Sequence, residues 1–254
     1  MSGEALDLEF VQQALARWGE PFTPEREHAF RQYGQLLLQW NERTNLTGLD
    51  EWSAIQRRLL VESLALLPWV DRACERKSPC RMIDVGTGAG IPGIPIAVVR
   101  PSLMITLLDA TAKKIRFLET VVQELRLPNV VPIHERAEVL AHRPAHRGRY
   151  HLATARALAH LATAFELTLP FLAPEGLALF PKGTGIEQEL AESRPALALL
   201  GGELLAVEPL PLADLVGTTS TLVVVRAVRP CPATYPRRPG IPAKRPLGEF
   251  TRKE

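Results

Sequence analysis

The stretch from Met82 to Pro95, "MIDVGTGAGIPGIP", is the most informative part of this chain. A short apolar run containing the acid Asp84 breaks into closely spaced glycines and prolines. Glycines directly after a strand let the backbone approach a ligand closely, and the helix that follows offers its positive dipole end. The stretch therefore predicts a strand, a ligand-binding loop and a helix, in that order.

Around this stretch, short apolar runs alternate with helical stretches between residues 80 and 228. The clearest helical stretch, "TAKKIRFLETVVQELRL", has one apolar face. This alternation predicts an α/β fold with a mainly parallel sheet covered by helices on both faces. The last two runs have no obvious helix between them, which predicts a hairpin and an antiparallel strand at one edge. The seven runs are "RMIDV", "MITLLD", "VVPIH", "HLATA", "GLALF", "ELLAVEPL" and "TLVVVRAV".

The remaining chain divides into a helical beginning and a basic end. Residues 1–78 predict three helices, over "ALDLEFVQQALARWG", "TPEREHAFRQYGQLLLQWN" and "DEWSAIQRRLLVESLALLPWV". Thr23 and Pro24 suit the N-cap and first position of the second helix. We therefore expect an N-terminal helical region over residues 1–78, a ligand-binding domain over 79–228 and a tail over 229–254.

The tail carries seven Lys or Arg and two Glu, a net charge of +5, whereas the whole chain carries only +2. Its six prolines predict a segment that is extended and stiff rather than packed. Basic side chains among prolines suit nucleic-acid phosphates, and Tyr235 offers a ring for stacking, although such contacts give affinity rather than choice of base. The candidate RNA-binding residues are Arg237, Arg238, Lys244 and Arg245.

Other features limit the class of protein. No apolar run is long enough to span a membrane, and the N-terminus lacks the pattern of a secretory signal. Cys74, Cys80 and Cys231 have no metal-ligand spacing and cannot all pair, so we expect a reduced, cytoplasmic protein without a metal site.

The glycine loop itself leaves several ligands open. Gly88, Gly90 and Gly93 fit the dinucleotide pattern G-x-G-x-x-G, so a tight turn without ligand and an NAD(P)-dependent oxidoreductase are both alternatives. However, Asp84 would repel a pyrophosphate and suits an amine, and the loop prolines remove N–H donors. A carboxylate that ends the second strand, Asp109, can accept hydrogen bonds from ribose hydroxyls. S-adenosylmethionine, which has a ribose and an amine but no phosphate, meets these conditions.

Several motifs together resemble a known family. They are "WNERTNLTGL", "RMIDVGTGAGIPGIPIAVVRP", "LLDATAKKIRFLETVVQEL", "HERAEVL", "ATARAL" and "FPKG". In this order they resemble the bacterial small-subunit rRNA guanine-N7 methyltransferases, the glucose-inhibited division protein B family. The resemblance implies a Rossmann-like class I methyltransferase with a seven-stranded sheet, which transfers methyl from S-adenosylmethionine to a guanine N7 in 16S rRNA (guanine 527 by the same resemblance). The tail resembles an extension that some members carry.

The resemblance also implies site residues. Members usually have a His and an Asp where this chain has Leu59 and Glu62, so the acid is kept in kind and the His is missing. The expected cofactor-binding residues are Asp84, Gly86, Gly88, Gly90, Ile91, Asp109, Ala110, Thr111, Ala137, Glu138 and Arg156. The expected catalytic residues are Arg156, Lys182 and Asn45.

Guanine N7 has a free lone pair, so methyl transfer to it needs no general base, and catalysis would be mostly proximity and orientation. Arg156 and Lys182 would hold the guanine O6, a phosphate or the cofactor carboxylate, although each could instead form a structural ion pair. Asn45 could cap a helix instead of lining the cleft. We expect a monomer acting on 16S rRNA or the 30S subunit, and the remaining alternative is a non-catalytic RNA-binding assembly factor. Removing residues 229–254 should weaken RNA binding and leave cofactor affinity nearly intact.

Overall fold

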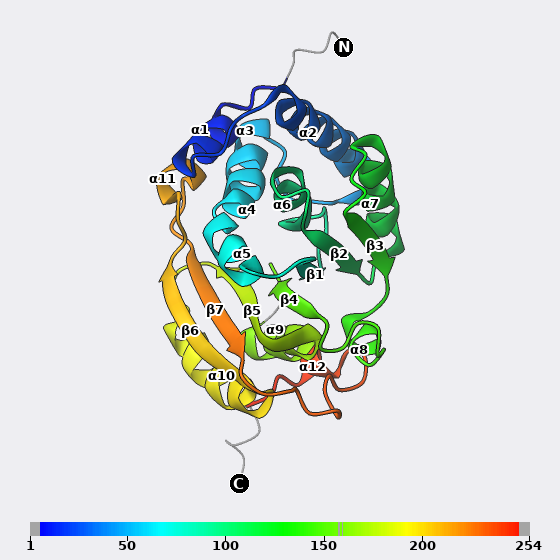
Figure 1. Cartoon of the computed structure of the whole chain (residues 1–254), viewed down its shortest axis with the longest axis vertical. Coiled ribbons are helices and arrows are strands. Elements are labelled where there is room, and N and C mark those ends of the chain that lie inside the picture. Colours follow the sequence, from blue (N-terminus) through cyan, green and yellow to red (C-terminus); the bar gives the residue numbers. More distant parts are fainter. Residues whose placement is uncertain (1–5, 157, 159, 249–254) are drawn as a thin grey trace.

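A computed structural model describes residues 6–156, 158 and 160–248, and it contains one seven-stranded sheet in the order β3-β2-β1-β4-β5-β7-β6 (Figure 1). The first five strands pair in parallel, and the predicted hairpin of the last two strands is confirmed. β7 pairs antiparallel with both β5 and the edge strand β6, so the predicted antiparallel pairing at one edge of the sheet is confirmed. The strands are β1 (Arg81–Val85), β2 (Met104–Asp109), β3 (Val130–His134), β4 (Tyr150–Thr154), β5 (Leu172–Lys182), β6 (Gly202–Pro209) and β7 (Thr221–Ala227).

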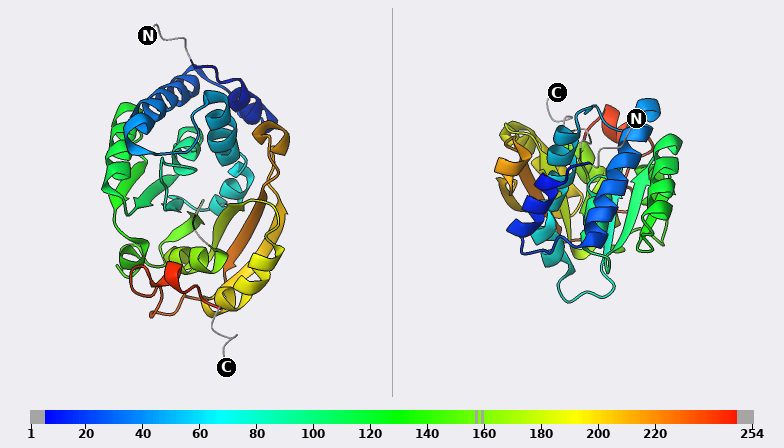
Figure 2. Two further views of the ribbon diagram at one scale, coloured as in Figure 1. Left: turned by 180° about the vertical axis from the view of Figure 1, so that it is seen from behind. Right: turned by 90° about the horizontal axis from the view of Figure 1, so that it is seen from above.

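Helices cover both faces of the sheet (Figures 1 and 2). Successive strand residues point to opposite faces, so Met82 packs in one apolar cluster and Ile83 in another. The Met82 face carries α1 (Glu9–Arg17), α2 (Pro24–Thr44), α3 (Trp52–Ile55), a π-helical segment η1 (Gln56–Val61), α4 (Glu62–Leu64), α5 (Leu67–Cys74), α6 (Gly93–Val99), α7 (Ala112–Glu124) and α11 (Ala213–Val216). The Ile83 face carries α8 (Ala137–Leu140), α9 (Leu161–Thr168), a 3₁₀ segment η2 (Leu169–Phe171) and α10 (Glu187–Leu199).

The N-terminal helices follow the sequence pattern only in part. Thr23 caps α2 by accepting a hydrogen bond from the Arg26 amide, and Pro24 opens the helix, as predicted. The predicted third helix is wrong as a single unit, because it divides into α3, η1, α4 and α5. Pro68 lies in the first turn of α5, where its missing N–H costs nothing. None of the described helices is both long and apolar enough to cross a membrane.

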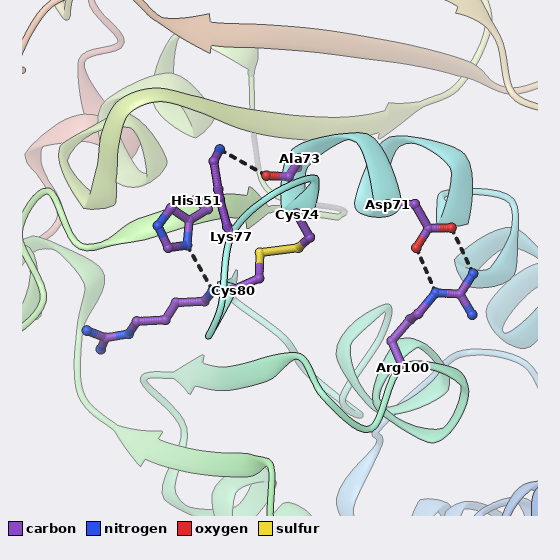
Figure 3. Close-up of a disulfide and its surroundings, with 8 residues drawn as sticks. Asp71, Ala73, Cys74, Lys77, Cys80, Arg100 and His151 are labelled. Carbon is purple, nitrogen blue, oxygen red and sulfur yellow. Dashed lines mark hydrogen bonds and ion pairs between the residues drawn. A yellow bond between two sulfur atoms is a disulfide. The ribbon is translucent and has the colours of Figure 1, made fainter.

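A disulfide joins Cys74, at the end of α5, to Cys80, just before β1 (Figure 3). Their Cα atoms lie 5.4 Å apart, a usual separation for a disulfide. The ammonium of Lys77 donates to the carbonyl of Ala73 within the same turn. The expectation of reduced cysteines is therefore wrong for this pair, and Cys231 is the free cysteine.

The C-terminal segment, which we define as residues 229–248, packs against α8 and α9 (Figure 1). It ends in a short helix, α12 (Ile241–Lys244), in which Pro242 is buried. The hydroxyl of Thr163 in α9 donates to the Pro242 carbonyl at 2.8 Å. The expectation of an extended, unpacked tail is wrong.

Candidate active site

A cavity of about 540 Å³ opens where β1 and β2 reach their carboxyl ends. This edge of a parallel sheet is the usual ligand site of doubly wound folds, and the volume suits a small ligand. The residues that line the cavity are Leu46, Thr47, Gly48, Leu59, Val85, Gly86, Thr87, Gly88, Ala89, Ile91, Leu108, Asp109, Ala110, Lys114, Glu135, Arg136, Ala137, Glu138, Arg156, Leu158, Leu167 and Ala243.

The amides of the glycine loop donate mostly within the protein. The Gly86 and Thr87 amides donate to the Leu108 carbonyl, and the Gly90 and Ile91 amides donate to the Thr87 carbonyl. The Gly93 amide donates to the Asp84 carboxylate, and the Gly88 amide donates to the Asp109 carboxylate. Pro92 has no N–H to give. Since a pyrophosphate needs several free backbone donors, the loop suits a ligand without one.

Asp84 holds the loop together instead of facing the ligand. Its carboxylate is fully buried and accepts from the Thr87 hydroxyl at 2.6 Å, the Thr154 hydroxyl at 2.9 Å and the Gly93 amide at 3.1 Å. Burial raises the pKa of Asp84 to about 7, although these three hydrogen bonds lower it in part. Asp84 is not among the lining residues, so the expectation that this acid meets an amine of the ligand is wrong.

The glycines of the loop serve two different purposes. Gly86 lines the cavity at φ +70°, and a Cβ there would lie 2.8 Å from the Leu158 side chain. Gly90 does not line the cavity, and a Cβ there would meet Ile94 at 2.5 Å. A Cβ on Gly93 would meet Leu107 at 2.2 Å. Gly90 and Gly93 are therefore needed for packing, whereas Gly86 keeps the cavity open.

Asp109 lies at the end of β2, in the cavity wall. Each of its carboxylate oxygens accepts one hydrogen bond from a backbone amide. The Gly88 amide donates to Oδ2 at 3.0 Å and the Thr111 amide to Oδ1 at 2.8 Å. The Lys114 ammonium lies 3.7 Å from Oδ2. Each oxygen keeps a second lone pair for a ligand hydroxyl. Ala110 lines the cavity beside Asp109, whereas Thr111 does not.

The far side of the cavity is formed by α8 and the turn before it. Ala137 and Glu138 line it as expected, and both are buried. The Glu138 carboxylate accepts from the Gly240 amide at 2.8 Å and from the Arg136 guanidinium at 3.3 Å. A residue of the C-terminal segment thus fixes a side chain of the cavity wall.

Arg156 lines the cavity from the residues after β4 and also forms an ion pair. Its guanidinium donates to one Glu62 carboxylate oxygen at 2.7 and 3.0 Å, and to the Arg58 carbonyl at 3.0 Å. The structural ion pair that the sequence left open is therefore present, and the side chain also faces the cavity. This ion pair connects α4 to the carboxyl end of β4.

Two of the expected catalytic residues lie outside the cavity lining. Lys182, at the end of β5, forms an ion pair with Glu189 of α10 at 2.7 Å. Asn45 ends α2 in the left-handed conformation, at φ 48°, which is the capping role left open above. Its neighbours Leu46 to Gly48 form that part of the cavity wall.

The four basic residues of the tail do not form one set. Arg237 is bound to Glu166 of α9, which is fully buried. The side chains of the other three are exposed to solvent. They are Arg238, Lys244 and Arg245.

Other functional contacts have no clear sequence signal. The buried Tyr33 hydroxyl of α2 donates to the Ala89 carbonyl of the glycine loop at 2.7 Å. In the sequence, Tyr33 is one of many apolar residues of an amphipathic helix. Ala243 also lines the cavity, although the nearest lining residues in the sequence are Leu167, Leu158 and Arg156, which lie 76, 85 and 87 positions before it. Only the folded tail brings Ala243 to the cavity. Within the described residues, no group of three His, Cys, Asp or Glu side chains could hold a metal ion.

Comparisons with known proteins agree with this arrangement. The chain is 41% identical to the ribosomal RNA small subunit methyltransferase G of Roseiflexus castenholzii over 231 residues, covering 91% of this chain and 95% of that protein. It is 39% identical to the protein of the same name from Chloroflexus aggregans, covering 92% and 96%. Among solved structures, a putative sarcosine dimethylglycine methyltransferase from Galdieria sulphuraria has a TM-score of 0.51 at 13% identity, covering 67% of this chain and 86% of that one.

The [4+2]-cyclase SpnF has a TM-score of 0.52 at 16% identity, covering 81% of this chain and 97% of that one, and these two likenesses show the shared fold. The family model described as rRNA small subunit methyltransferase G matches residues 26–213, which is most of the chain. The chain therefore belongs to the rRNA small subunit methyltransferase G (GidB) family and is an rRNA methyltransferase.

Proposed function

We propose that this protein transfers a methyl group from S-adenosylmethionine to N7 of a guanine in 16S rRNA, acting in the cytoplasm as a monomer. The observation that carries the choice of cofactor is the glycine loop, whose amides mostly donate within the protein while Asp109 keeps lone pairs at the cavity wall. A ribose can use that carboxylate, but a pyrophosphate would find few amide donors. The same observation disfavours an NAD(P)-dependent oxidoreductase.

The cofactor-binding residues we propose are those of the predicted set that line the cavity. They fit S-adenosylmethionine because Gly86 leaves room for a ligand beside the backbone, and Asp109 offers acceptors to ribose hydroxyls. Ala137 and Glu138 would border the adenine. The complete set is Gly86, Gly88, Ile91, Asp109, Ala110, Ala137, Glu138 and Arg156.

S-adenosylmethionine, when bound, supplies an electrophilic methyl group on a sulfonium sulfur. Guanine N7 has a free lone pair and carries no proton at neutral pH, so no side chain has to remove one. The protein's task is to place N7 in line with the bond that breaks. The Glu62 carboxylate offsets the Arg156 charge beside the new cationic guanine, and the remaining N–H groups of Arg156 can orient a guanine O6 or a carboxylate.

The exposed basic residues Arg238, Lys244 and Arg245 would contact rRNA phosphates. Arg237 is left out of this set because the Glu166 carboxylate already neutralises it. Phosphate contacts of this kind position the RNA, whereas the cavity selects the base.

The test is transfer of labelled methyl to 16S rRNA and to 30S subunits from a strain that lacks this methylation. We expect label at one guanine N7, detected by chemical cleavage of the RNA at N7-methylguanine, and the better substrate identifies the natural one. Absence of N7-methylguanine from both substrates would contradict the proposal. Calorimetry should give binding of S-adenosylmethionine and none of NADH.

A further inference from the structure

The C-terminal segment lies outside the residues that match the family model, yet it reaches the cavity. Ala243 lines the cavity, and the Gly240 amide donates to Glu138 on the cavity wall. Gly240 has φ +81°, a conformation that favours glycine, and it starts α12. Two separate contacts therefore connect this segment to the candidate active site.

A buried ion pair and the hydrogen bond from Thr163 to the Pro242 carbonyl anchor the segment to α9. Glu166 of α9 is fully buried, and both of its oxygens accept from Arg237. The Arg237 amide donates at 2.7 Å, Nε at 2.9 Å and Nη2 at 2.6 Å. Arg237 Nη2 also donates to the Arg245 carbonyl, so the same guanidinium closes the turn that contains Gly240.

Removing Arg237 would leave Glu166 as an unpaired buried charge, which is strongly unfavourable. That charge favours departure of the segment from α9, because water can then reach the carboxylate. The Arg147 guanidinium adds hydrogen bonds to the carbonyls of Cys231, Pro232 and Tyr235, but these lie before the turn that reaches the cavity.

We propose that the Arg237–Glu166 pair is a positioning device for cofactor binding, because it holds Gly240 and Ala243 in place as one wall of the cavity. The proposal rests on the proposed cofactor site. The C-terminal segment is then part of the cofactor site. Removing residues 229–254 should therefore weaken cofactor binding, contrary to the expectation from the sequence. Arg237 itself does not touch the ligand cavity.

The test measures binding of S-adenosylhomocysteine to the full-length protein by calorimetry, which needs no RNA. In Arg237→Met we expect the dissociation constant to rise about tenfold, as it would if a tenth of the molecules kept the segment docked. Glu166→Gln, which removes the charge but keeps an acceptor, should give a smaller rise. Arg17→Met breaks an exposed ion pair with Asp214 and serves as the matched control, with affinity unchanged.

Hydrogen exchange of residues 236–248, compared with exchange of the sheet, provides a second reading, because a general loss of stability would speed both and undocking would speed the segment alone. If docking of the segment favours ligand binding, ligand binding must favour docking to the same extent. S-adenosylhomocysteine should therefore slow exchange of the Gly240 amide in Arg237→Met. An unchanged dissociation constant in a variant whose segment exchanges freely would overturn the proposal, and so would a segment that stays protected in both variants. If the unaltered protein binds no S-adenosylhomocysteine, the proposed cofactor fails instead.

Discussion

Gly86 is the position where a single substitution should most directly close the site. Its backbone has φ +70°, which is costly for any residue with a Cβ, and a Cβ there would lie 2.8 Å from Leu158. Gly86→Asp would add a charged group to the cavity as well. We expect the dissociation constant of S-adenosylmethionine to rise at least about 100-fold, or about 3 kcal/mol, in calorimetry.

Gly183→Asp is the matched control for that variant. Gly183 lies outside the cavity, and a Cβ there would have no neighbour within 4 Å. The same substitution at this site should leave cofactor affinity unchanged. Tight cofactor binding by the Gly86→Asp protein would mean that this cavity is not the cofactor site.

Asp84 should make stability depend on pH in an unusual direction. Burial raises the pKa of Asp84 to about 7, well above its unfolded value near 4. Between these values the folded protein holds a proton that the unfolded chain has lost, so the free energy of unfolding falls as pH rises from about 4 to about 7. The fall is at most about 1.4 kcal/mol per pH unit from this one group.

Urea unfolding across that window, with Asp84→Asn as the comparison, measures the effect. Asparagine has almost the same volume and cannot lose a proton. Its side-chain oxygen can accept from the Gly93 amide, and its nitrogen can donate to the Thr154 hydroxyl. The difference in unfolding free energy between variant and wild type should therefore grow in favour of the variant as pH rises. Parallel curves for the two proteins would show that Asp84 does not titrate there.

Asp84 also illustrates what a local pattern can and cannot establish about a residue. An acid near a glycine loop is visible in the sequence, but its partners Thr87 and Thr154 lie 3 and 70 positions away. Only the pairing of β1 with β4 brings Thr154 to it. Asp109 could be placed correctly, because the end of the second strand already fixes its position at the cavity.

At the scale of single elements, the disulfide joins the end of α5 to the start of β1 and closes a short loop. A short loop limits how much unfolded-chain entropy the bond can remove, to about 2 kcal/mol in the chain-entropy treatment. We expect Cys80→Ser to lower the free energy of unfolding by about this amount, measured by urea denaturation of the oxidised protein.

Reduction supplies the control, because a reductant should destabilise the wild type and leave Cys80→Ser unchanged. Affinity for S-adenosylmethionine should stay the same in both proteins, since Cys74 and Cys80 do not line the cavity. Equal unfolding free energies of wild type and variant under oxidising conditions would contradict the pairing.

Helices and strands differ in how well their limits could be predicted. Short apolar runs identified all seven strands, and Thr23 with Pro24 identified the start of α2, because those signals are local. It failed for the predicted third helix, where an almost continuous apolar run conceals the changes to η1 and α5. Such a run is compatible with one long buried helix, and only packing against neighbouring elements decides where it divides.

At the scale of the whole molecule, the three predicted regions share their packing. Phe30 and Tyr33 of the N-terminal helices belong to the same apolar cluster as Met82 and Leu107 of the sheet. Composition shifts suggested boundaries near residues 78 and 228, but the contacts that cross them are long-range. The Arg237–Glu166 pair, for example, joins residues 71 positions apart, which no local pattern reveals.

RNA binding by the whole molecule should depend on the exposed basic side chains of the C-terminal segment. Arg238, Lys244 and Arg245 are exposed on the C-terminal segment, so changing all three to alanine removes charge while leaving the Arg237–Glu166 pair in place. Each phosphate contact with single-stranded RNA contributes about 0.7 to the slope of log affinity against log salt concentration. The triple variant should therefore bind 16S rRNA more weakly, with a slope smaller by about 2, and S-adenosylhomocysteine with unchanged affinity. RNA binding with an unaltered slope would place the phosphate contacts on another surface.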